Sequence, residues 1–114
     1  MAHLKHHLYH LQRVTLQVMT FLDGAVSRIP YYAKNEGSIP DLLRDIEALI
    51  NKMEHERAIE RIEQFIDQVK FDQAESHIPP FDAVSLIETA TRLLEQIHEQ
   101  MNREAGDSPS QTTS

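Results

Sequence analysis

Apolar residues recur in alternating steps of four and three along the first thirty residues of the chain. This spacing gives an α-helix one continuous apolar side. We therefore predict a helix over residues 2–28. Gly24 lies inside it and indicates a weak point or a close approach of a second helix, because the pattern continues past it. The stripe consists of Leu4, Leu8, Leu11, Thr15, Val18, Leu22, Ala25 and Ile29.

The pattern is interrupted at residues 29–38, which we interpret as a connector because Pro30 disfavours helical geometry in the residue before it. Ser38 is expected to cap the next helix. Pro40 in the first turn and Asp41 at the third position give a sequence close to a capping box. A helix is therefore predicted to begin near residue 39.

Residues 39–73 carry two apolar faces on one uninterrupted stretch of helix-forming sequence. At 100° per residue the two faces are rotated by about 150° from each other. Either the chain turns near residues 53–57 into a helical hairpin, or one long helix uses opposite faces in an intertwined dimer. We favour the hairpin, because a continuous helix leaves one apolar face uncovered in a small monomer. The first face holds Ile39, Leu42, Leu43, Ile46, Leu49, Ile50 and Met53, and the second Ala58, Ile62, Phe65, Ile66 and Val69.

A second interruption at residues 76–80 precedes a last helix, capped by Asp82 and running to about Arg103. Residues 106–114 are rich in Ser and Thr and are predicted to be a disordered polar tail. We therefore predict one all-α domain over residues 1–105. It is an antiparallel bundle of three long or four shorter helices. The stripe of the last helix consists of Ala83, Ile87, Ala90, Leu94, Ile97 and Met101.

Composition excludes several classes of function. The 114 residues include 18 acidic and 11 basic side chains, giving a net charge of −7. An acidic protein repels phosphate groups, so we expect neither nucleic acid nor an anionic membrane surface as partner. The absence of cysteine excludes disulfides and thiolate metal sites. No apolar run approaches the ~18 residues that span a bilayer, and we expect a cytoplasmic protein.

Histidines near the start of the chain are the main candidates for chemistry. His3 and His7 are four residues apart, as are His6 and His10, a spacing that lets two imidazoles share a metal ion. Helical geometry places His3, His7 and His10 on one flank of the apolar stripe, a partial site for zinc or nickel. A further ligand has to come from elsewhere, and His98 is one candidate.

The sequence contains no pattern that indicates catalysis. It has no phosphate-binding glycine loop, no nucleophile elbow and no zinc-protease helix. Glu95 and His98 match half of the ligand motif of di-iron bundles, but a second copy is absent. We therefore expect no enzyme activity, no catalytic residue and no cofactor.

The favoured hypothesis is a small helical interaction module, an adaptor, regulator or chaperone-like protein that covers an amphipathic helix of another protein or of a second copy. Tyr9 and Leu16 lie off the main stripe of the first helix. Tyr31, Tyr32 and Phe81 lie in connectors, where such residues usually cap the ends of a bundle but can also form an exposed patch. The alternative hypothesis is a metal-binding or metal-responsive protein that uses His3, His7 and His10.

Overall fold

The computed structural model describes residues 2–34 and 37–105, with side chains from residue 12 to residue 104 of these ranges. The described residues form helices and no strand, so the predicted all-α class is confirmed. Four long helices and one short one lie in the order α1 (Ala2–Ser27), α2 (Pro30–Ala33), α3 (Ile39–Asn51), α4 (His55–Ala74) and α5 (Pro80–Ala105). The predicted tail at 106–114 lies outside the described residues.

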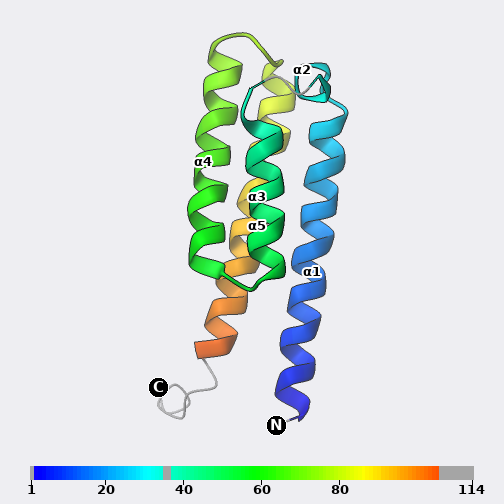
Figure 1. The fold of residues 1–114 in the computed structure, drawn as a ribbon, viewed down its shortest axis with the longest axis vertical. Coiled ribbons are helices and arrows are strands. Elements are labelled where there is room, and N and C mark those ends of the chain that lie inside the picture. The colour runs from blue at the N-terminus through cyan, green and yellow to red at the C-terminus, as the bar shows by residue number, and fades with distance from the viewer. Residues whose placement is uncertain (1, 35–36, 106–114) are drawn as a thin grey trace.

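The four long helices run alternately up and down, forming an antiparallel bundle (Figure 1). α1 and α4 each pack against both α3 and α5, and α2 lies at the end of α1. α1 and α5 are twice as long as α3, at 26 residues against 13. At the end where α1 begins and α5 finishes, both helices therefore run past the α3–α4 turn (Figure 1).

The hairpin predicted for residues 39–73 is confirmed, and the single long helix is wrong. α3 finishes in a Schellman motif. The amide of Glu54 donates to the carbonyl of Leu49, and that of Met53 to the carbonyl of Ile50, both at 3.0 Å. Met53 takes the left-handed conformation that this motif requires, with φ 61°. The chain therefore reverses at residues 52–54, and the two apolar faces both turn toward the bundle axis.

The core confirms the predicted helices but shifts the centre of two stripes by about one residue. On α1 the deepest side chains include Met19 and Val26, while Val18 and Ala25 are only half-buried. On α5 a one-residue shift in the opposite direction along the sequence buries Leu86 and Leu93 more deeply than Ile87 and Leu94. Each long helix packs against two other long helices, and these neighbours determine which of two adjacent apolar positions points to the axis.

Three local predictions need correction. Gly24 marks no close helix approach, because a Cβ at this position would have no atom of another helix within 4 Å, so of the two interpretations only the weak point remains. Ser38 precedes α3, but its hydroxyl makes no capping bond, and its carbonyl accepts from the amide of Leu42 at 3.0 Å. Asp82 is not the cap of α5, since the helix begins earlier, at Pro80. Proline suits a first turn because its missing N–H would have no helical partner there.

Candidate functional site

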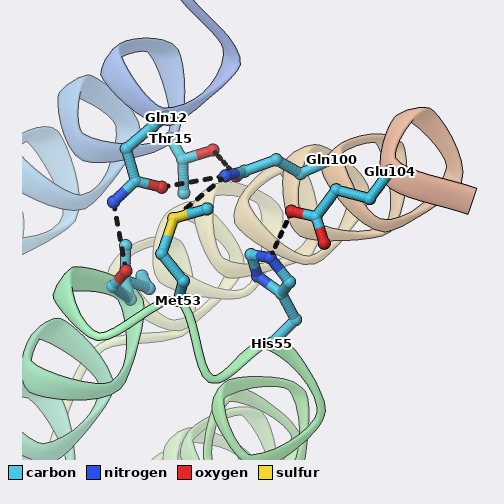
Figure 2. A network of polar contacts seen from close by, with 7 residues as sticks. Gln12, Thr15, Met53, His55, Gln100 and Glu104 are labelled. Carbon is cyan, nitrogen blue, oxygen red and sulfur yellow. Dashed lines mark hydrogen bonds and ion pairs between the residues drawn. The ribbon is translucent and has the colours of Figure 1, made fainter. Parts of the chain in front are cut away.

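A buried polar layer crosses the bundle near the α3–α4 turn (Figure 2). Gln100 on α5 is 1% exposed, yet its amide is fully engaged. Its Oε1 accepts from Thr15 Oγ1 at 3.1 Å, and its Nε2 donates to Gln12 Oε1 at 2.9 Å. Gln12 in turn donates to the carbonyl of Ile50 at 3.1 Å. The layer thus connects α1, α5 and the last turn of α3.

The same layer reaches the turn itself. Gln100 Nε2 also contacts Met53 Sδ at 3.8 Å. Next to it, His55 Nε2 lies 2.9 Å from Glu104 Oε2, joining the first residue of α4 to the end of α5 (Figure 2). These two contacts fix the α3–α4 turn against α5. They connect residues about fifty positions apart in the sequence.

An open cavity of about 600 Å³ lies at this junction, and we name it the turn pocket. Its apolar walls come from two methionines, one in the turn and one on α5. Its polar walls carry three carboxylates, one guanidinium and one imidazole, so the carboxylates outnumber the cationic groups and the local charge is negative. The lining residues are Met53, Glu54, His55, Glu56, Arg57, Met101 and Glu104.

The opposite end of the bundle is closed by a second polar cluster. Tyr32 on α2 donates its hydroxyl to Asp72 Oδ2 at 2.7 Å, and Gln68 donates to Oδ1 at 3.0 Å. Tyr32 and Asp72 are only 2% and 1% exposed. Burial raises the pKa of the Tyr32 phenol well above its usual range, and the neighbouring Asp72 raises it further. The cluster anchors α2 to α4.

The residues predicted to bind a partner differ in how deeply the structure buries them. Tyr32 is buried in this cluster. Tyr31 is half-buried and stacks on His77, with ring centroids 4.6 Å apart. Leu16 is half-buried and packs against the core. Phe81, in the first turn of α5, is 83% exposed, and the side chain of Tyr9 lies outside those described.

The histidines of the alternative hypothesis, His3, His7 and His10, have side chains outside the described ones. Within the described part of the chain, no three or more His, Cys, Asp or Glu side chains gather closely enough to hold a metal ion. His98 and Glu95 are both exposed on α5. The described residues therefore assemble no metal site of this kind.

The turn pocket was missed by sequence reasoning. The polar run 54–57 between two apolar faces is the one visible signal, and it predicts a turn rather than a site. That Met101 and Glu104 meet this turn depends on how far α5 extends past it. No periodicity within one helix contains that information.

Comparisons with known proteins leave the function open. No protein-family model, curated protein or solved structure matches this chain. Among the described residues, no helix combines the length and the apolar character needed to cross a membrane.

Proposed function

We propose that this protein is a non-catalytic interaction module that binds a basic amphipathic helix at the turn pocket. The observation that carries the proposal is a concave surface with two methionines on its apolar walls and carboxylates around them. Methionine side chains are unbranched and polarisable, and they adapt to different apolar partners. The pocket can therefore receive an apolar anchor residue while its carboxylates attract flanking cations.

The exposure of Met53 supports this proposal. Its side chain is 41% exposed although it stands beside the core, so a ligand that covers it removes apolar surface from water. Glu56 is exposed and Glu104 lies at the same opening. Exposed charges of this kind contribute chiefly to the rate of encounter and to partner choice. The partner that fits is a helix with an apolar face flanked by Lys or Arg.

Fluorescence anisotropy with a labelled Leu/Lys peptide of about 14 residues, long enough to form a helix on binding, tests the proposal. Saturable binding is expected, weakening as NaCl rises from about 0.05 to 0.5 M. Met53→Lys should reduce the affinity about tenfold or more, because it places a cation in the apolar wall. Glu56→Gln should reduce it about 1.4- to 5-fold, the range for exposed charge pairs.

Phe81→Lys is the matched control. It changes an exposed apolar residue to lysine in the first turn of α5. α5 begins at the other end of the bundle from the α3–α4 turn (Figure 1), so the substitution should leave peptide binding unchanged. Equal losses in Met53→Lys and Phe81→Lys, or binding unaffected by Met53→Lys, would contradict the proposed site.

A further inference from the structure

The first turns of α1 lie at the same end of the bundle as the turn pocket. α1 begins at Ala2, beyond the α3–α4 turn (Figure 1), and comes level with the last turn of α3 at Gln12, which donates to the carbonyl of Ile50. Beyond that layer α3 has ended and α4 has not begun, so among the described helices α5 is the one packed against α1 that also continues in this direction. We name residues 2–11 the α1 extension.

The sequence of the α1 extension has the chemistry that the turn pocket is proposed to bind. It contains Lys5 and four histidines, and the chain has no Asp or Glu before Asp23. Leu4, Leu8 and Leu11 follow the four-and-three spacing of one helix face. All the acidic residues of the protein, including those of the turn pocket, come later in the chain. Charge and apolar spacing are thus complementary between two parts of the same sequence.

We propose that the turn pocket of one copy receives the α1 extension of a second copy, so that the protein forms a homodimer. This inference rests on the proposed function and names its partner. α1 is one continuous helix, so its start cannot fold back without breaking the helix. Two copies meeting by these ends, related by a two-fold axis, make two identical contacts, each between the extension of one copy and the pocket of the other.

Sedimentation equilibrium on the full chain tests the proposal at concentrations from about 1 µM to 1 mM. A mass of twice the monomer is expected at the upper end, with dissociation as NaCl increases. Leu8→Asp, in the extension, and Met53→Lys, in the pocket, should each give a monomer with unchanged helical content by circular dichroism. Phe81→Lys should remain dimeric.

Mixing the two monomeric variants gives the sharpest result. In a mixed pair, the intact extension of Met53→Lys meets the intact pocket of Leu8→Asp, while the other contact carries both changes. One of two contacts is therefore restored, and the mixture should associate more strongly than either variant alone. A wild type that is monomeric throughout, or a mixture no more associated than its parts, would overturn the proposal.

Failure of the proposed dimer can be distinguished from failure of peptide binding at the turn pocket. The Leu8→Asp variant has a free pocket, so the Leu/Lys peptide should bind it at least as well as it binds wild type. Peptide binding with a monomeric wild type retains the proposed function and removes the dimer. A dimer that is unaffected by Met53→Lys removes the pocket as its contact.

Discussion

Tyr32→Phe removes a single hydroxyl group from the closed end of the bundle and tests the polar cluster there. The hydroxyl donates to Asp72 at 2.7 Å, and both side chains are buried. Without it, Asp72 Oδ2 loses its donor, while Oδ1 keeps the bond from Gln68. A hydrogen bond to a charged group contributes about 1.5–3 kcal/mol to folding, so we expect the free energy of unfolding to fall by that amount.

Urea unfolding followed by circular dichroism at 222 nm measures this loss at pH 7. In a domain of this length about 4 °C of melting temperature corresponds to 1 kcal/mol. In a separate thermal melt, the melting temperature should therefore fall by about 6–12 °C. Combining Tyr32→Phe with Asp72→Asn completes a double-mutant cycle, in which a coupling of about 0.5–3 kcal/mol is expected. A loss below about 0.5 kcal/mol, or a coupling of zero, would refute the reasoning.

Alkaline pH provides an independent measurement on the same residue. Folding raises the pKa of Tyr32 above its value near 10 in the unfolded chain, chiefly through burial. The stabilisation by Tyr32 is therefore fully present below pH 10 and is lost as the pH rises, by about 1.4 kcal/mol per unit. Tyr32→Phe has no such loss, so the difference in unfolding free energy between the two proteins should shrink above pH 10. A constant difference from pH 8 to 11 would contradict the raised pKa.

Three further substitutions test other parts of the fold by urea unfolding. Gly24→Ala should raise the unfolding free energy by about 0.8–1 kcal/mol, because the helix continues through an open position; a destabilised variant would contradict this. Ser76→Gly should raise it by about 0.5–1 kcal/mol, since Ser76 has φ 63° at the end of α4; Ser76→Ala is the control, with no gain expected. Gln100→Leu should lower it by about 1–3 kcal/mol, because the hydrogen bonds of Thr15 and Gln12 to the buried Gln100 amide are lost. An unchanged or raised stability would show that the polar layer is dispensable.

Part of the site could be expected from the sequence and part could not. The polar run 54–57 indicated a nearby turn, and the chain reverses at residues 52–54, so most of the run forms the first turn of α4. Phe81 is exposed, consistent with an exposed patch, whereas Tyr32 beside the similar Tyr31 is buried and paired with Asp72. Two adjacent tyrosines in a connector have no periodic pattern to separate them. Their environments differ because Tyr32 reaches α4, which lies forty residues later in the chain.

The sequence by itself determined the four long helices and their order and favoured the hairpin, because an apolar face depends only on the 100° step between neighbouring residues. It did not predict the short helix α2, which lies in the predicted connector. The tertiary structure decided which side chains of those faces are deepest, as Met19 and Leu93 show. It also buried Gln100, whose partners lie on α1, and brought Met101 to the α3–α4 turn. The physical reason is that a local period fixes the direction of a side chain about its own helix axis. It does not fix the neighbour that the side chain meets.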